Sequence, residues 1–308
     1  MNNFNNTLYI DTDNNAKYLE LIIQLKLPDL LIVDDPLLAS IALVSPPLLS
    51  AKISQFAKLE WAQSIYAGVD TLSKHSTEID FTVTNVKGIF GQQISEYVIG
   101  YSLEYYRHFL QYKEQQNSNE WSPIPYTTLD NKCMLVLGTG SIGNHVAKTA
   151  KALGLNVIGV NRSGIPPKDS NFDETYHIQE LTVSLSKADI IVSTLPNTPD
   201  TQYLLNEKTL SHCKNALLFN VGRGTSIDEK GLLIALSKGF LSHAYLDVFI
   251  QEPLDVKHPY WNHPQITITP HIAAVSFPEQ VIEQFKSNYM NWISGFNLEN
   301  VVDLNKGY

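Results

Sequence analysis

Three polar residues in the second half of the sequence are candidates for a catalytic group made of a cation, a carboxylate and an imidazole. Arg223 lies in the run NVGRG, Glu252 in the run LDVFIQEP and His271 in the run TPHIAA, and each run follows or ends an apolar, strand-like segment. Ligands of open α/β sheets bind outside the carboxyl ends of the strands. We therefore expect the three side chains to converge there, although each of them alone would more often be an ordinary surface or structural residue.

These residue types are ones that can bind a carboxylate, donate a proton and stabilise that donor, and the reaction that would use them is the one implied by the family resemblance described below. Arg223 can hold a planar carboxylate with two parallel hydrogen bonds and can polarise the neighbouring carbonyl group. Hydride addition leaves negative charge on the carbonyl oxygen, and a protonated His271 can neutralise it, because the ordinary histidine pKa of ~6.5 lies near neutral pH. Glu252 at hydrogen-bond range would stabilise the imidazolium form. The reverse oxidation would need the same imidazole neutral, as a base.

A glycine-rich turn predicts where a dinucleotide cofactor binds. Gly138, Gly140 and Gly143 form the pattern GxGxxG between an apolar strand and a helix with apolar residues at helical spacing. The first glycine permits a tight turn, the second lets a pyrophosphate approach the backbone, and the third lets helix and strand pack closely. The helix N-terminus supplies N–H groups and partial positive charge. We assign cofactor binding to this turn, including Ser141 and Ile142.

The residues after the next strand favour NADP(H) over NAD(H). Asn161, Arg162 and Ser163 stand where NAD-binding proteins usually carry the Asp or Glu that binds the ribose 2′-hydroxyl. Arg162 can bind a 2′-phosphate through several donors, and Asn161 and Ser163 can add neutral hydrogen bonds. The alternative is a solvated surface arginine. We expect NADP(H) to be preferred, with NAD(H) still possible.

Short apolar runs alternate with helical patterns along the chain, which predicts an α/β fold with mainly parallel sheets. The expected strands are Leu30–Val33, Ile41–Val44, Leu59–Ser64, Phe81–Thr84, Cys133–Leu137, Asn156–Val160, Asp189–Ser193, Ala216–Asn220, His243–Val248 and Ile266–Thr269. The expected helices are Tyr18–Leu25, Leu48–Ala57, a long one from Gln92 toward Tyr112, Asp228–Lys238 and a closing helix after Pro278. The polar stretch Lys113–Glu120 is expected to connect two domains.

Length and composition restrict the possible functions. The chain has 308 residues, enough for two domains, and 22 Lys and Arg against 31 Asp and Glu give a formal charge of −9. An acidic chain without a long basic run is a poor candidate for binding nucleic acid or an anionic membrane. The two cysteines, Cys133 and Cys213, offer neither a disulfide framework nor a zinc spacing, so no metal is expected. The start MNNFNN does not resemble a signal peptide, and we expect a cytoplasmic protein.

Taken together, these motifs resemble those of the D-isomer-specific 2-hydroxyacid dehydrogenases. The matching runs are GTGSIG, TLPNT at 194–198, NVGRG, LDVF with QEPL, HPYW at 258–261, TPHIAA, AGVD at 67–70 and NVKGIFGQQISE at 85–96. The resemblance extends over nearly the whole chain and is most specific between Cys133 and Ala274. Within the family, the length and the AGVD, NVKGIFGQQISEY and NRS runs are most similar to NADPH-preferring glyoxylate/hydroxypyruvate reductases.

The resemblance implies a Rossmann-type dinucleotide-binding domain, residues 99–275, inserted in a smaller flavodoxin-like substrate domain, residues 1–98 plus 276–308. It implies an enzyme that reduces a small 2-keto acid to a D-2-hydroxy acid, with a homodimer as the expected assembly. The implied roles are substrate-carboxylate binding by Arg223, proton transfer by His271 and support of that histidine by Glu252. The other implied contacts are the substrate with the loop Ala67, Gly68 and Val69, and the cofactor with Leu195, Pro196, Val221 and Asp247.

Two other functions remain open from the sequence. A non-catalytic nucleotide sensor, like the corepressors built on the same fold, would keep the glycine turn and could retain Arg223, Glu252 and His271 without turnover. A methyltransferase also has a glycine-rich turn, but it has no use for the TPH and EP runs. Oxidation of NADPH by a panel of 2-keto acids distinguishes the enzyme from both.

Overall fold

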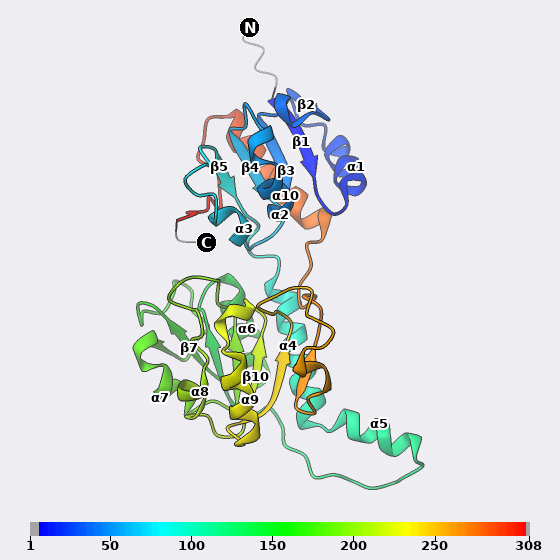
Figure 1. The fold of residues 1–308 in the computed structure, drawn as a ribbon, viewed down its shortest axis with the longest axis vertical. Helices are drawn as coiled ribbons and strands as arrows, with labels where there is room; N and C mark the ends of the chain where they lie inside the picture. The colour runs from blue at the N-terminus through cyan, green and yellow to red at the C-terminus, as the bar shows by residue number, and fades with distance from the viewer. Residues whose placement is uncertain (1–5, 306–308) are drawn as a thin grey trace. The chain divides into compact units, whose positions relative to one another are not determined.

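The computed structural model of the protein describes residues 6–305. The chain forms two compact units, of which the first runs to Ile89 and resumes at Ser276, and the second is Phe90–Val275. Each unit is built on its own parallel sheet with helices beside it (Figure 1). The division after Ile89 places the whole of helix α4 (Gly91–Tyr106) in the second unit, whereas the boundary expected at residue 98 lies inside that helix.

The first unit contains a five-stranded parallel sheet in the order β2-β1-β3-β4-β5. This is the strand order of flavodoxin-like folds. The strands are β1 (Asn6–Asp11), β2 (Leu30–Ile32), β3 (Ile41–Val44), β4 (Trp61–Ser64) and β5 (Thr82–Thr84). The helices are α1 (Asn15–Leu25), α2 (Pro46–Lys52), α3 (Asp70–Ser73) and α10 (Pro278–Ile293).

Helix α10 ties the end of the chain into the core of the first unit. Its Phe285 is buried and stacks on Trp61 of β4, with ring centroids 5.3 Å apart. The Trp61 indole N–H donates to Thr84 Oγ1 at 2.8 Å, so the polar edge of this buried ring also has a partner. Trp61 is therefore a core residue. The closing helix expected after Pro278 is confirmed.

The second unit contains a seven-stranded parallel sheet in the order β12-β11-β10-β9-β6-β7-β8. The strands are β6 (Cys133–Leu137), β7 (Asn156–Asn161), β8 (Glu174–His177), β9 (Ile190–Ser193), β10 (Ala216–Asn220), β11 (Leu241–Leu246) and β12 (Ile266–Ile268). The order turns back between β6 and β9, which is the doubly wound Rossmann arrangement with its ligand crevice at that switch point. The expected fold class is thus confirmed.

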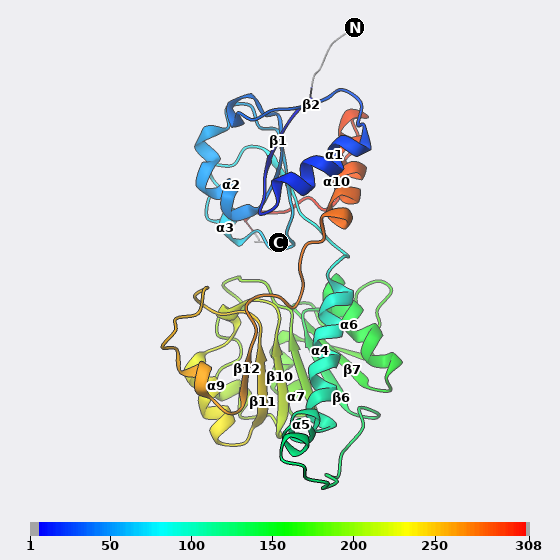
Figure 2. The ribbon, with the colours of Figure 1, turned by 90° about the vertical axis from the view of Figure 1, so that its right-hand side faces the viewer.

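The helices of the second unit are α4 (Gly91–Tyr106), α5 (Phe109–Asn117), α6 (Ser141–Ala152), α7 (Leu181–Leu185), α8 (Glu207–Leu210) and α9 (Glu229–Ser237). Helix α5 contacts α4, buries none of its residues and projects away from the sheet (Figure 1), whereas the other helices pack beside it. Helix α4 runs alongside α6, as Figure 2 shows. The central strands β6, β9 and β10 are buried and mostly apolar, because both faces of the sheet are covered there, whereas the edge strand β8 is polar.

The long helix expected from Gln92 toward Tyr112 is interrupted. His108 has a left-handed backbone, with φ of 57°, and ends the regular path after α4. Helix α5 then continues to Asn117, into the stretch that was expected to be a connection. The continuous apolar spacing concealed this break because a left-handed residue changes the direction of the helix axis and leaves the sequence pattern unchanged.

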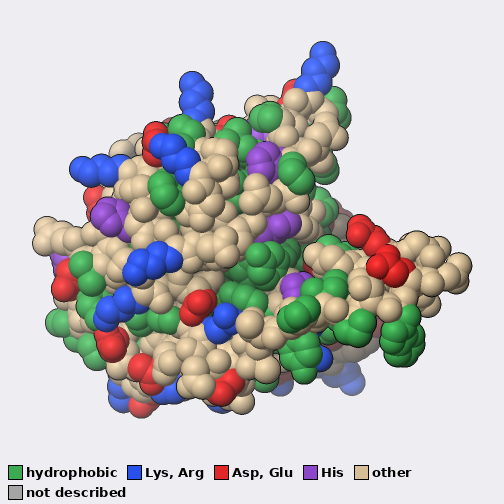
Figure 3. All heavy atoms as spheres, turned by 90° about the horizontal axis from the view of Figure 1, so that it is seen from below, with side chains coloured by type: hydrophobic (Ala, Val, Ile, Leu, Met, Phe, Trp, Pro, Cys, Tyr) green, Lys and Arg blue, Asp and Glu red, His purple; other side chains and the backbone are tan. Residues whose placement is uncertain are grey.

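Large hydrophobic side chains are exposed around α5. They include Phe109, Leu110, Tyr112, Trp121 and Tyr126. Figure 3 shows hydrophobic, basic and acidic side chains interspersed over one face of the molecule. Among residues 6–305, no helix is long and apolar enough to cross a membrane.

Candidate active site

The glycine turn after β6 has the geometry that a bound pyrophosphate requires. Gly138 has φ of 97°, which only glycine adopts without strain. A Cβ atom on Gly143 would lie 2.0 Å from the Gly138 carbonyl oxygen, so only glycine permits this close packing of α6 on the turn. A Cβ on Gly140 would meet no atom within 4 Å, so its outer face is open. Because α6 begins at Ser141, its first N–H groups are presented at this open face. The turn fits a dinucleotide phosphate.

The residues after β7 form a turn that the Asn161 side chain organises. Its Oδ1 accepts hydrogen bonds from the N–H groups of Ser163 and Gly164 and from Ser163 Oγ, at 2.7 to 3.1 Å. Its Nδ2 donates to Thr139 Oγ1 at 2.9 Å and to the Ile165 carbonyl at 2.8 Å. Asn161 therefore holds this turn against the glycine turn. Its amide is used within the protein and holds the turn that presents the exposed Arg162, and the predicted contact of Asn161 with the cofactor stays a prediction.

Arg223 follows β10 and lies between two neighbouring loops. A Cβ on Gly222 would lie 2.5 Å from the Leu195 carbonyl oxygen, and one on Gly224 would lie 2.0 Å from the Phe249 carbonyl carbon. The glycines on both sides of Arg223 thus allow the loops after β9 and β11 to press against it. Arg223 Nη1 donates to the Gly222 carbonyl at 2.8 Å, which fixes part of this half-buried side chain.

His271 and Glu252 form a hydrogen-bonded ion pair. His271 Nδ1 lies 2.7 Å from Glu252 Oε2, and Glu252 Oε1 accepts from the Phe249 N–H at 2.8 Å. The side chains are 48% and 37% exposed, so a substrate can reach them. Since Nδ1 is engaged by Glu252, the second ring nitrogen, Nε2, is the one we assign to a substrate.

The pKa values of the pair shift in opposite directions. The hydrogen bond that His271 donates to Glu252 raises the pKa of His271 above its ordinary value, although burial and the charge of Arg223 oppose the shift. Burial acts to raise the pKa of Glu252, but the hydrogen bonds from His271 and the Phe249 N–H outweigh it, and the net shift is downward. Both shifts favour the imidazolium form of His271 and the carboxylate form of Glu252. The charge of Arg223 acts on the pKa of both Glu252 and His271, so the three side chains lie close together in the structure.

Asp247 holds the turn that carries His271. His271 has a left-handed backbone, with φ of 55°, and its N–H donates to the Asp247 carbonyl at 2.9 Å. The buried Asp247 carboxylate accepts from the Ile272 N–H at 2.8 Å and from the Ala273 N–H at 2.9 Å. Both carboxylate oxygens thus bind the backbone of this turn, and the contact with the cofactor that the family resemblance implies stays a prediction. Nothing in the local sequence around Asp247 signals this role, because the partners are more than 20 residues away.

The other predicted site residues lie on two units. Leu195 and Pro196 follow β9 and Val221 follows β10, at the carboxyl ends of adjacent strands of the second unit. Ala67, Gly68 and Val69 follow β4 in the first unit. There the buried Asn85 donates from Nδ2 to the Ala67 carbonyl at 2.7 Å, which orients this loop.

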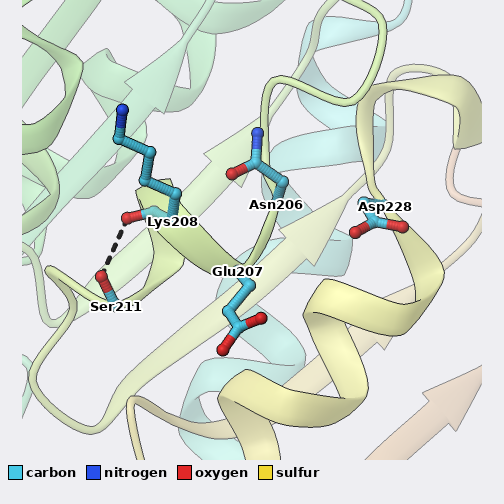
Figure 4. Close-up of a pocket in the computed structure, with 5 residues that line it drawn as sticks. All are labelled: Asn206, Glu207, Lys208, Ser211 and Asp228. Atoms are coloured by element: carbon cyan, nitrogen blue, oxygen red, sulfur yellow. Dashed lines mark hydrogen bonds between the residues drawn. The ribbon is translucent and has the colours of Figure 1, made fainter.

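A separate hollow on the second unit has no catalytic character. Figure 4 shows its lining: Asn206, Glu207, Lys208, Ser211 and Asp228. Asn206 and Asp228 cap α8 and α9, and Glu207 pairs with Lys238 at 2.9 Å. Its polar groups therefore stabilise helix ends. Among residues 6–305, no three His, Cys, Asp or Glu side chains are grouped as a metal site.

Comparison with known proteins decides the family. The NAD-binding domain model of the D-isomer specific 2-hydroxyacid dehydrogenases matches residues 99–273. The chain belongs to this family. It is 37% identical over 218 residues to a glyoxylate/hydroxypyruvate reductase A of Serratia proteamaculans, a match that covers 70% of this chain and 69% of that protein.

Solved structures agree with this placement in the 2-hydroxyacid dehydrogenase family. A family member from Aeromonas salmonicida is 42% identical, with a TM-score of 0.91, and the match covers 97% of this chain and 99% of that one. An NADPH-dependent glyoxylate/hydroxypyruvate reductase from Sinorhizobium meliloti, solved with NADP and sulfate, is 27% identical, with a TM-score of 0.84 and coverage of 98% and 100%. The chain is thus a family oxidoreductase with the NAD-binding domain of its relatives.

Proposed function

We propose that the protein reduces small 2-keto acids, with glyoxylate and hydroxypyruvate as the first candidates, to D-2-hydroxy acids at the expense of NADPH. The observation that carries the proposal is the His271–Glu252 pair at 2.7 Å beside the charge of Arg223. A proton donor, its supporting carboxylate and a cation for the substrate carboxylate are the groups that this reaction needs.

Each catalytic side chain has a defined task in this proposal. Arg223 binds the substrate carboxylate and polarises the carbonyl group, which aligns the carbonyl carbon for attack. His271 donates a proton from Nε2 to the carbonyl oxygen, while Glu252 stabilises the imidazolium through Nδ1. The backbone N–H groups of the loop Ala67 to Val69 add donors for the substrate carboxylate. Bound NADPH supplies the hydride.

We propose that the second unit holds the cofactor. The open face at Gly140 and the N-terminus of α6 would take the pyrophosphate, and Arg162 with Ser163 would take the 2′-phosphate. The absence of an acidic side chain at Asn161 supports NADP(H) over NAD(H). The relative from Sinorhizobium meliloti was solved with NADP, which also supports this preference.

Steady-state turnover tests the proposed function. NADPH or NADH is mixed with glyoxylate, hydroxypyruvate or pyruvate, oxidation is followed by absorbance, and the chirality of each chiral product is determined. We expect turnover with at least one keto acid, a D product, and a higher kcat/KM with NADPH than with NADH. Tight NADPH binding without turnover of any keto acid would contradict the proposal and favour a nucleotide sensor.

The assembly and the cellular location stay predictions. A twofold homodimer is the commonest assembly of soluble chains, and analytical ultracentrifugation measures it directly. The cytoplasmic location that the sequence favours is measured by fractionation of the source cells.

A further inference from the structure

One face of helix α4 contacts both ends of the segment that carries His271. Gln93 and Tyr97 are four residues apart in α4, so their side chains lie on the same face. Tyr97 reaches Thr269, and Gln93 reaches Val275. His271 lies between these two anchor points in the sequence. The mechanism proposed above uses none of these four side chains or backbone groups.

The contacts from Tyr97 form a hydrogen-bond chain with a defined direction. Thr269 Oγ1 donates to Asp247 Oδ1 at 2.6 Å, because the carboxylate already accepts from backbone N–H groups on both oxygens. The Thr269 hydroxyl has one proton, so in its 2.7 Å contact with the Tyr97 hydroxyl it must accept. The chain therefore runs from Tyr97 O–H to Thr269 O–H to Asp247.

This chain ends on the group that shapes the catalytic turn. The Asp247 carbonyl accepts from the His271 N–H, and its carboxylate accepts from the Ile272 and Ala273 N–H groups. Asp247 is 2% exposed and Thr269 is 9% exposed, so water cannot readily replace a lost hydroxyl. A buried carboxylate that loses one of its three donors is less stable, and it would shift to recover a partner. A shift of Asp247 moves the backbone of His271.

The second anchor holds the other end of the segment. Gln93 Oε1 accepts from the Val275 N–H at 2.9 Å, and Gln93 Nε2 donates to the Val275 carbonyl at 3.0 Å. The side-chain amide thus pairs with both backbone groups of one residue. With Thr269 and Val275 both attached to α4, the turn between them has little freedom to change its direction.

We propose that helix α4 positions His271 for proton transfer through the chain Tyr97–Thr269–Asp247, so that Tyr97 and Thr269 are positioning residues of the reaction. The proposal rests on the proposed function, because it assigns His271 as the proton donor. It adds two residues that touch neither substrate nor cofactor in that mechanism.

The test uses hydroxyl deletions that keep side-chain shape. Thr269→Val and Tyr97→Phe each remove one link of the chain, and Thr269→Ser restores the hydroxyl. Tyr101→Phe is the matched control, since Tyr101 makes an edge-to-face contact with Tyr97 one turn further along α4 and its hydroxyl makes no hydrogen bond within the part of the chain described. The measurements are kcat, KM for the keto acid, the pH–rate profile and the melting temperature.

We expect Thr269→Val to lower kcat by about tenfold or more, because a small misplacement of a proton donor slows the chemical step, while KM changes less than about twofold. Tyr97→Phe should lower kcat by a smaller factor, since Thr269 still reaches Asp247. Thr269→Ser should recover most of the loss, and Tyr101→Phe should match the wild type. The alkaline limb of the pH profile should move to lower pH in Thr269→Val. Glu252 and Asp247 raise the pKa of His271 and Arg223 lowers it, and a displaced His271 should lose part of the raising contact with Glu252.

Unchanged kcat and pH profile in Thr269→Val would overturn the proposal, even if the melting temperature fell, because that combination indicates a purely structural role. A further readout does not depend on turnover. The NMR titration of the His271 ring, assigned by its loss in His271→Ala, should differ between wild type and Thr269→Val. If the wild type reduces no keto acid but the His271 titration differs between the wild type and Thr269→Val, the proposed function fails and the positioning of His271 stands. If the titration is the same in both proteins, the positioning proposal itself is overturned.

Discussion

Two glycine-to-alanine substitutions in the same turn should fail in different ways. In Gly143→Ala the new methyl group would lie 2.0 Å from the Gly138 carbonyl oxygen and 3.1 Å from Val136 Cγ1. Because the first neighbour is backbone, α6 and the turn must separate by more than an ångström. Overpacking of this kind costs about 3 kcal/mol, the upper part of the usual range. For a unit of this size, that loss lowers the melting temperature by roughly 6–12 °C.

Gly140→Ala should leave the fold nearly unchanged and weaken cofactor binding. The new methyl group meets no protein atom within 4 Å, and the backbone φ of −70° suits alanine. The loss of glycine at this helix cap should cost less than about 1 kcal/mol. The methyl group occupies the open face to which we assign the pyrophosphate, so the Kd for NADPH should rise about tenfold or more, the equivalent of about 1.4 kcal/mol.

Scanning calorimetry and titration of NADPH by fluorescence measure the two effects separately. Gly100→Ala is the matched control, because Gly100 lies in the interior of α4 with no atom within 4 Å of its new methyl group. It should stabilise the protein by about 0.5–1 kcal/mol and leave NADPH binding unchanged. Wild-type NADPH affinity in Gly140→Ala, or wild-type stability in Gly143→Ala, would refute the assignment of roles within the turn.

Three further predictions concern charge. Glu252 raises the pKa of His271, so His271 stays protonated to a higher pH than an ordinary histidine. In Glu252→Gln, the alkaline loss of reductase activity should therefore begin at a lower pH than in the wild type. The control Glu229→Gln alters another His–Glu pair and should leave the profile of kcat/KM between about pH 5 and pH 9 unchanged. Arg162→Ala should raise KM for NADPH about tenfold and KM for NADH less than about twofold; equal effects would contradict 2′-phosphate binding. Asn161→Asp should lower the ratio of kcat/KM for NADPH to that for NADH, because the acid repels a phosphate and cannot donate to its two present acceptors.

The features that the sequence predicted well depend on local geometry. The glycine turn could be located because its three positions each impose a steric requirement that is visible as residue type. The central strands β6, β9 and β10 of the second unit could be located because burial on both faces leaves apolar runs. Strands β1 (Asn6–Asp11) and β8 (Glu174–His177) were missed because they carry polar residues among the apolar ones, which weakens that signal.

The features that the sequence could not predict depend on which side chains fold against each other. Nothing in the sequence shows that the polar atoms of Asn161 and Asp247 bind backbone groups and a neighbouring hydroxyl, and their expected contacts with the cofactor stay predictions. The hydrogen bond between Tyr97 and Thr269 had no sequence signal, since the two residues are 172 residues apart and meet only through packing of α4 beside the sheet. Residue type reveals hydrogen-bonding capacity, and only the fold decides which partner uses it.

The steady-state rate and the NADPH affinity of His271→Ala, measured on the same preparation, test the central claim most directly. A general acid contributes roughly 10²–10⁴-fold to the rate, so keto acid reduction should fall by at least the lower of these factors while the Kd for NADPH stays within about twofold of the wild type. Turnover at the wild-type rate in His271→Ala would contradict the claim that this histidine delivers the proton.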